Sequence, residues 1–133
     1  MNGYVREQTS TLLRRLAYQV AQMGKTADAD EIHDLRVAIR RLNRCLQVFA
    51  EFYPTRARKK VRRKLSEMMD GAAEVRDRDI AVELLREAGM PKGATAFRVL
   101  EQERAEAAEA LVGILKHWKH ADFSRKWRGD LSL

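Results

Sequence analysis

Apolar residues recur along the chain at alternating spacings of three and four, which is the period of amphipathic α-helices. No run alternates with the period of two that marks a half-buried β-strand. The clearest apolar stripe comprises Ile32, Leu35, Ile39, Leu42, Leu46 and Phe49. The pattern predicts helices over residues 4–23, 29–52, 55–88 and 94–118, and a short amphipathic turn over residues 122–128. Four main helices with short connections predict an all-α fold, an antiparallel four-helix bundle with a short C-terminal helix.

Turn and cap signals place the boundaries of these helices. Asp28 or Asp30 is expected to cap the second helix, where an acid also suits the positive end of the helix dipole. Pro54 is expected to end that helix, and Thr55 to cap the third. Gly71, followed by two alanines, marks a candidate bend within the third helix. No internal repeat or low-complexity tract is visible, so the chain is predicted to form one domain.

Positive charge is concentrated in the middle of the chain. The net charge is +7, in a composition with 45% hydrophobic and 34% charged residues that is ordinary for a folded protein. Residues 36–64 hold eleven lysines or arginines against one acid, Glu51, so this segment carries +10. Residues 79–133 hold nine basic and nine acidic residues and are neutral. Such a local excess indicates a polyanionic partner, the alternative being a solvated surface of two neighbouring helices.

Opposite the apolar stripe, the second predicted helix presents a file of basic side chains. His33, Arg36, Arg40 and Arg44 recur at spacings of three and four, so they stack along one side, with Arg41 beside the file. Like charges at this spacing repel one another unless an anion lies over them. Because arginine can donate two parallel hydrogen bonds to phosphate, the file suits a ligand that is itself a row of phosphates. His33 is open to two interpretations, an anion ligand or a structural residue near the helix start.

The third predicted helix adds further positive charge. Its periodicity places Lys60, Arg63 and Lys64 together on one flank, while Lys59 and Arg62 are expected to face outward. A second informative stretch follows at residues 76–79, where the sequence Arg-Asp-Arg-Asp alternates in sign. One of its two acids is a candidate to hold an arginine of the basic file in position, and the alternative is surface pairing of little energetic value.

Other site chemistries find little support in the sequence. Cys45 is the only cysteine, so no intramolecular disulfide can form, and its place near the apolar face predicts burial. His33 has no second histidine or cysteine at ligand spacing, and His117 and His120 lack a carboxylate pair, so no metal and no cofactor are expected. There is no glycine-rich phosphate loop and no marked acid–base pair, so we expect no catalytic residues and no enzyme activity. The absence of a long apolar run predicts a soluble, cytoplasmic protein.

The combined pattern resembles the conserved histidine α-helical domain (CHAD) family. The hallmark helix of that family, His-x-x-Arg-Val-x-x-Arg-Arg-x-x-Arg, is matched without a gap by His33, Arg36, Val37, Arg40, Arg41 and Arg44. A Lys/Leu-rich helix leading into Arg-Asp-x-Asp-Val is matched by Lys64-Leu65 and by residues 76–80, where isoleucine replaces the valine. The resemblance covers about residues 4–128. It implies an all-helical protein that binds inorganic polyphosphate through a basic groove without catalysis, and that in some members associates with polyphosphate granules.

The resemblance also implies which residues bind. The role falls on His33, Arg36, Arg40, Arg41 and Arg44, and further on Lys60, Arg63, Lys64 and Arg76. This sequence departs from the family at Ala73, where glycine is frequent, and at Asn43, which interrupts the basic run.

Length is a further departure, because family members usually hold two related bundles and a second basic helix. This chain, residues 1–133, has a single His-x-x-Arg and corresponds to one bundle. We therefore predict a homodimer that rebuilds the groove. The alternatives are a nucleic-acid-binding module that uses the same face on backbone phosphates, a helper subunit that docks an acidic protein or feeds a phosphate-chain enzyme, and a phosphate-transfer enzyme with His33 as nucleophile or acid.

Overall fold

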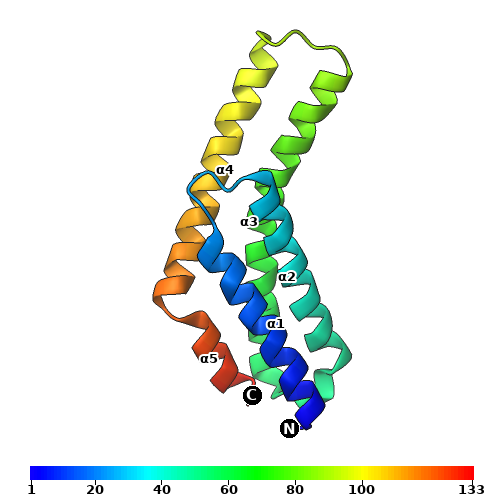
Figure 1. Ribbon diagram of the computed structural model, residues 1–133, viewed down its shortest axis with the longest axis vertical. Coiled ribbons are helices and arrows are strands. Elements are labelled where there is room, and N and C mark those ends of the chain that lie inside the picture. Colours follow the sequence, from blue (N-terminus) through cyan, green and yellow to red (C-terminus); the bar gives the residue numbers. More distant parts are fainter.

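The computed structural model describes residues 1–133, and every regular element is helical. The elements are α1 (Gly3–Gln22), α2 (Ala29–Val48), the 3₁₀ helix η1 (Ala50–Phe52), α3 (Thr55–Glu87), α4 (Thr95–His120) and α5 (Phe123–Asp130). Consecutive long helices run antiparallel, and both termini lie at the same end of the molecule (Figure 1). The predicted all-α fold, a four-helix bundle with a short C-terminal helix, is confirmed. None of the helices combines the length and the apolar character needed to cross a membrane.

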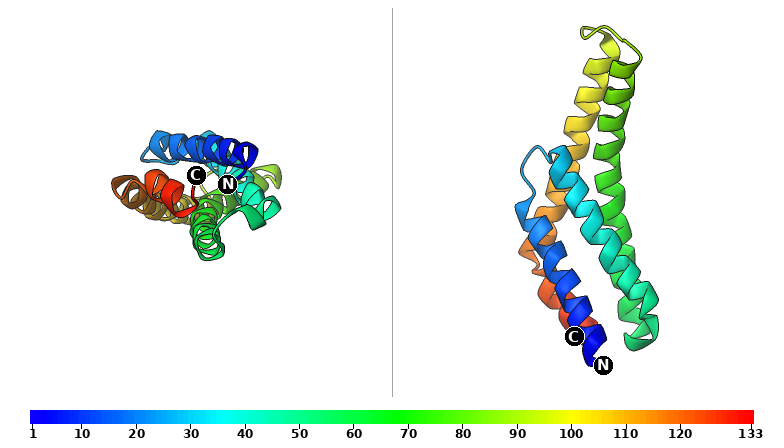
Figure 2. Two further views of the ribbon diagram at one scale, coloured as in Figure 1. Left: turned by 90° about the horizontal axis from the view of Figure 1, so that it is seen from below. Right: turned by 45° about the vertical axis from the view of Figure 1, so that its right-hand side comes forward.

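The apolar stripes of the four long helices converge on a single core. Among the side chains with no exposed surface are Leu13, Leu16, Leu35, Leu42, Leu46, Met68, Ala72, Val75 and Leu111. The short helix α5 closes the end of the bundle near the termini, beside α1 and α4 (Figure 2). There Phe123 and Trp127 pack against Trp118 of α4, with ring centroids 5.0–5.6 Å apart. Rings at these separations in tilted or edge-to-face geometry stabilise the closure beyond simple burial.

The α3–α4 hairpin extends past the α1–α2 loop as a two-helix arm (Figure 1). Between Val75 and Ala108 no residue is buried, although both helices continue through this region. We call residues 76–107 the arm, with its base beside the α1–α2 loop and its tip at the α3–α4 loop. Two helices bury only the sides that face each other, so the arm lacks the core that the rest of the chain has.

Three details of the helix boundaries differ from the sequence-based expectations. The second helix ends at Val48, before the expected end at residue 52, because the chain passes through a 3₁₀ turn on its way to Pro54. Thr55 is the first residue of α3 and not its cap, since Pro54 takes the capping position without a side-chain hydrogen bond. α3 is helical across Gly71, where an added Cβ would lie 3.1 Å from Cδ1 of Leu111. This glycine therefore allows α4 to approach closely.

Candidate anion-binding site

The start of α2, which carries the basic file, is fixed by a capping box. The Asp28 carboxylate accepts a hydrogen bond from the Glu31 backbone N–H at 2.9 Å, and the Glu31 carboxylate accepts one from the Asp28 N–H at 3.1 Å. Glu31 also accepts from the backbone N–H of Gly24 at 2.8 Å, which ties the α1–α2 loop to the helix. Asp28 is thus the cap among the two predicted candidates. His33 is exposed and takes no part in this capping.

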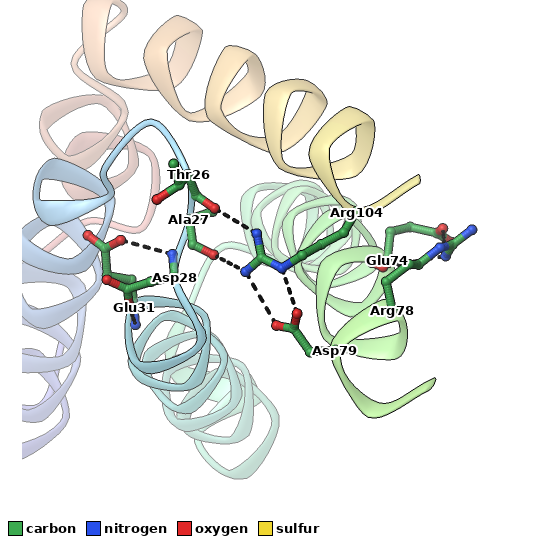
Figure 3. Close-up of polar contacts among 8 residues, drawn as sticks. All are labelled: Thr26, Ala27, Asp28, Glu31, Glu74, Arg78, Asp79 and Arg104. Atoms are coloured by element: carbon green, nitrogen blue, oxygen red, sulfur yellow. Dashed lines mark hydrogen bonds and ion pairs between the residues drawn. The ribbon is translucent and has the colours of Figure 1, made fainter. Parts of the chain in front are cut away.

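The α1–α2 loop is also held from the other side, by Arg104 of α4 (Figure 3). Its guanidinium group donates to the carboxylate of Asp79 and, at 2.9 and 2.8 Å, to the backbone carbonyls of Thr26 and Ala27. Ala27 is fully buried and has a positive φ of 46°, a conformation that this contact supports. The sequence offered Asp77 and Asp79 as candidates to hold an arginine of the basic file. Asp79 does not do so, because it pairs with Arg104 of α4 and supports the start of α2 only through the α1–α2 loop.

Arg36 lies at the centre of a cluster of guanidinium groups from α2 and α3. Burial lowers the pKa of Arg36 below that of an ordinary arginine, and the charges of Arg76 and then Arg40 lower it further. Asp77 opposes this shift but forms no ion pair with Arg36. The Nε atom of Arg36 is buried and has no hydrogen-bond partner. The structure therefore brings together three of the predicted site residues and leaves one of their donors unsatisfied.

The neighbouring part of the α2–α3 contact contains two arginines that the sequence reasoning missed. Arg62 was expected to face outward, but its Nε donates to Oδ1 of Asn43 at 3.0 Å, across to α2. The asparagine that interrupts the basic run thus fixes an arginine of the next helix. Arg58, one turn before Arg62, has a buried Nε without a partner, like that of Arg36. The two arginines are four residues apart and so lie on the same side of a helix, and this spacing could have revealed them in the sequence.

We call the surface formed by these residues the α2–α3 basic face. Its members are His33, Arg36, Arg40 and Arg44 of α2 and Arg58, Arg62 and Arg76 of α3. No acidic side chain forms an ion pair with any of them. The arginines of this face are therefore not neutralised by the fold.

Three predicted site residues of α3 lie away from this face. Helical spacing puts Lys60 and Lys64 in line with Gly71 and Arg78, and those two contact α4 through Leu111 and Glu103. Lys64 forms an exposed ion pair with Glu67 at 3.9 Å. The third residue, Arg63, is exposed on the outer side of α3. The structure therefore does not bring these three cations together with Arg36.

Arg41 also departs from the file, as its sequence position beside it suggested. It is one turn before Cys45, whose sulfur lies 3.6 Å from the Thr9 hydroxyl of α1. Arg41 therefore lines a cleft between α1 and α2, together with Arg14 and Arg15. The arginines of α2 serve two different surfaces.

The remaining sequence-based candidates are accounted for by packing. Cys45 is buried, as predicted, beside the Tyr53 hydroxyl, which makes a 2.6 Å hydrogen bond with Thr9. Burial raises the pKa of Tyr53 well above its ordinary range. Nowhere in the chain do three or more histidine, cysteine or acidic side chains gather in a way that could hold a metal ion.

Comparison with known proteins identifies the family of the chain. The family model of the CHAD domain matches residues 7–131, which is nearly the whole chain. That family is linked in general to polyphosphate binding. No match was found among curated proteins or among solved structures. With its histidine–arginine file on α2 and its Arg-Asp-x-Asp segment at the base of the arm, the chain belongs to the CHAD domain family.

Proposed function

We propose that this protein binds inorganic polyphosphate, without turning it over, through the α2–α3 basic face. One observation carries the proposal, the state of Arg36, which lies with Arg40 and Arg76 and has a buried, unpartnered Nε. A buried donor without an acceptor costs about 1–3 kcal/mol, and neighbouring cations add repulsion. Phosphate oxygens over this cluster offset the repulsion, and they accept hydrogen bonds from the guanidinium groups.

A chain of phosphates fits the face better than a single phosphate does. Arg36, Arg40 and Arg44 follow one another at about 6 Å along the axis of α2, given the rise per residue of a helix. A linear polyanion laid along α2 can contact each of them in turn, whereas one phosphate group leaves most of the file unpaired. His33 at the upper end of the file extends the same line, and we assign it a ligand contact because the capping box does not need its side chain.

The cations outside the face have a secondary part in this proposal. Lys60, Arg63 and Lys64 raise the positive potential around the protein and speed the approach of a polyanion, but they do not touch it together with Arg36. Nucleic acid is the competing ligand, since its backbone phosphates meet the same face. We also expect binding to take place in the cytoplasm and to bring the protein to polyphosphate granules.

The decisive experiment compares long-chain polyphosphate with duplex and single-stranded nucleic acid at matched salt. We expect a clear preference for polyphosphate and a steep fall in affinity as salt rises. The variant Arg36→Ala/Arg40→Ala should lose about thirtyfold or more in polyphosphate affinity, since each arginine donates charge-assisted hydrogen bonds. Its matched control is Lys60→Ala/Lys64→Ala, which removes the same charge from the α4 side of α3.

The two variants separate a site from a general basic surface. If both lose affinity equally, net charge explains binding and the α2–α3 face has no special role. Equal affinity of the wild type for all polyanions would lead to the same conclusion. The single change His33→Ala tests the histidine, and unchanged affinity would return it to a surface role.

We further propose that two copies pair through their arms and that this places their basic faces along one groove. Ile80 and Leu84 lie one turn apart on α3 with 42% and 59% of their surface exposed, in an arm without a single buried residue. In an antiparallel pairing of two arms, this apolar pair of one copy meets the same pair of the other. Arg76 then lies toward the end where the second copy carries Glu87, so the charges match as well.

Light scattering coupled to gel filtration tests this pairing with and without polyphosphate. We expect a dimer with polyphosphate, because the anion removes the repulsion between two basic faces. Leu84→Glu should give a monomer under the same conditions, whereas Val48→Glu, at an equally exposed position at the far end of α2, should not. A wild-type monomer in the presence of polyphosphate would contradict the pairing.

A further inference from the structure

A cleft on the other side of α2 differs in its chemistry from the α2–α3 basic face. It lies between the antiparallel helices α1 and α2, which run side by side along the bundle (Figure 2). Its volume of about 540 Å³ falls within the range of small-molecule sites, roughly 300–1,000 Å³. The lining residues are Thr11, Leu12, Arg14, Arg15, Tyr18 and Gln19 of α1 with Asp34, Val37, Ala38 and Arg41 of α2.

The charged side chains around this cleft form no ion pairs with other residues of the protein. Arg15 and Arg41 form no ion pair and no side-chain hydrogen bond, and Arg14 donates only to the Thr11 hydroxyl at 3.2 Å. Asp34 also has no ion-pair partner, although three arginines line the same cleft. The cleft therefore offers both unpaired donors and one unpaired acceptor to a ligand.

The apolar and aromatic lining distinguishes this cleft from the basic face. Leu12, Val37 and Ala38 supply an apolar surface between the two helices. Tyr18 lines the cleft with 59% of its surface exposed, so one face of its ring is free to stack. The α2–α3 basic face has no tyrosine, phenylalanine or tryptophan among its members, and the acid beside it, Asp77, forms no ion pair with Arg36. A bare phosphate chain needs neither a ring to stack on nor an acidic acceptor, and the carboxylate of Asp34 repels it.

We propose that the α1–α2 cleft binds a nucleoside di- or triphosphate. Arg15 and Arg41, on opposite walls, hold the phosphates, because paired guanidinium groups match their oxygens. The ring of Tyr18 stacks on the base, and the apolar surface excludes water beneath it. The Asp34 carboxylate accepts hydrogen bonds from the ribose hydroxyls, which are donors that a bare phosphate chain lacks. Each chemical feature of the cleft thus has a counterpart in the ligand.

Titration of isotope-labelled protein with ATP, followed by NMR, locates the site. We expect amide shifts in residues of α1 and α2 that line the cleft, and a weaker response to tripolyphosphate at the same residues. Arg15→Ala/Arg41→Ala should weaken ATP binding about tenfold or more. The control Arg36→Ala/Arg40→Ala should leave the ATP-induced shifts in the cleft in place. Because that control is the variant expected to weaken polyphosphate binding, the two proposals fail independently.

Two further variants test the roles of the base and the ribose. Tyr18→Ala should weaken ATP binding about fivefold or more without changing tripolyphosphate binding, while Tyr18→Phe should retain ATP affinity because its ring still stacks. Asp34→Ala should abolish the preference for ATP over 2′,3′-dideoxy-ATP, because it removes the acceptor for the ribose hydroxyls. ATP-induced shifts confined to the α2–α3 face would overturn the proposal. Equal affinity for ATP and tripolyphosphate in both the wild type and Tyr18→Ala would also overturn it.

Discussion

The arginines of α2 and those of the α3–α4 hairpin differ in what they contact. Every ion pair of the structure lies within α3 or between α3 and α4, and none includes one of the four arginines of α2. The acids of α2, Asp30, Glu31 and Asp34, all lie in its first two turns, and none is three or four residues from an arginine of the helix. Paired cations on the hairpin stabilise the fold, whereas the unpaired cations on α2 cost stability and remain free for a ligand.

Two arginines, Arg104 of the hairpin and Arg36 of α2, show this difference between paired and unpaired cations. The Arg104 side chain is 22% exposed, and its nitrogens donate to a carboxylate and to two carbonyls. Arg36 is also partly buried, but it lies among cations and its Nε has no acceptor. Partial burial of an arginine therefore does not by itself indicate a structural role. The role depends on whether the guanidinium group has hydrogen-bond acceptors in the fold.

The largest expected effect on stability comes from removing Arg104. Arg104→Ala leaves Asp79 and two loop carbonyls without their donor, so the free energy of unfolding should fall by about 2–3 kcal/mol. Urea unfolding followed by circular dichroism measures this loss. Arg98→Ala, an exposed arginine on the same helix without a partner, is the matched control and should change stability little. If the two variants are equally stable, the hydrogen bonds of Arg104 to Asp79 and to the α1–α2 loop do not stabilise the fold.

Arg36→Ala should separate binding from stability. We expect polyphosphate affinity to fall about tenfold, because charge-assisted hydrogen bonds are lost. The free energy of unfolding should stay within about 1 kcal/mol of the wild type or rise, because the change relieves repulsion from Arg76 and Arg40. Isothermal calorimetry and urea unfolding on the same preparation provide both values. A large loss of stability would show that Arg36 belongs to the fold.

Screening of the α2 arginines should have a smaller effect. Raising the salt concentration or adding tripolyphosphate should increase the free energy of unfolding by about 0.5–1 kcal/mol, because both reduce repulsion between neighbouring guanidinium groups. The double variant Arg36→Ala/Arg40→Ala should show less of this increase. A thermal melt series over salt concentration measures it, and a decrease in stability with salt would mean that the hairpin ion pairs dominate the electrostatics.

The smallest effect is expected at the exposed ion pair of the hairpin. Lys64→Ala removes a 3.9 Å pair whose partners are 42% and 56% exposed, so stability should change by less than about 0.5 kcal/mol. Polyphosphate affinity should also be nearly unchanged, since Lys64 lies on the α4 side of α3. Both values come from the same unfolding and binding assays. A marked loss of polyphosphate affinity in Lys64→Ala would show that the binding site includes the α4 side of α3.

Helical periodicity predicted the faces of single helices well and the contacts between helices poorly. The stripe of α2 is buried as expected at Leu35, Leu42 and Leu46, because burial depends on the helix period alone. The same period grouped Lys60 with Lys64, but Arg63, expected on the same flank, lies on the outer side of α3. The period did not reveal that the flank of Lys60 and Lys64 faces α4, because the arrangement of helices in a bundle depends on packing across the whole core.

The hydrogen-bond and ion-pair partners of polar side chains could not be predicted from the sequence, for a related reason. Asn43 and Arg62 lie on consecutive helices, and Asp79 and Arg104 face the α1–α2 loop from far along the chain. Each contact requires a particular alignment of two helices, which a sequence pattern does not specify. The alternation of Arg and Asp at residues 76–79 indicated ion pairing, which Arg78 and Asp79 form, but it did not reveal that the partner of Asp79 is Arg104 of α4.

The absence of buried residues in the arm has a consequence for how the chain opens in solution. Amide hydrogens exchange with solvent through local unfolding, whose free energy follows the apolar contacts that must be broken. Amides at the tip of the arm should therefore exchange with deuterium long before those of α3 near Leu65 and Met68, although both segments belong to one continuous helix. Any molecule that covers the arm should slow this exchange, so a deuterium-uptake profile provides a sensitive record of its occupancy.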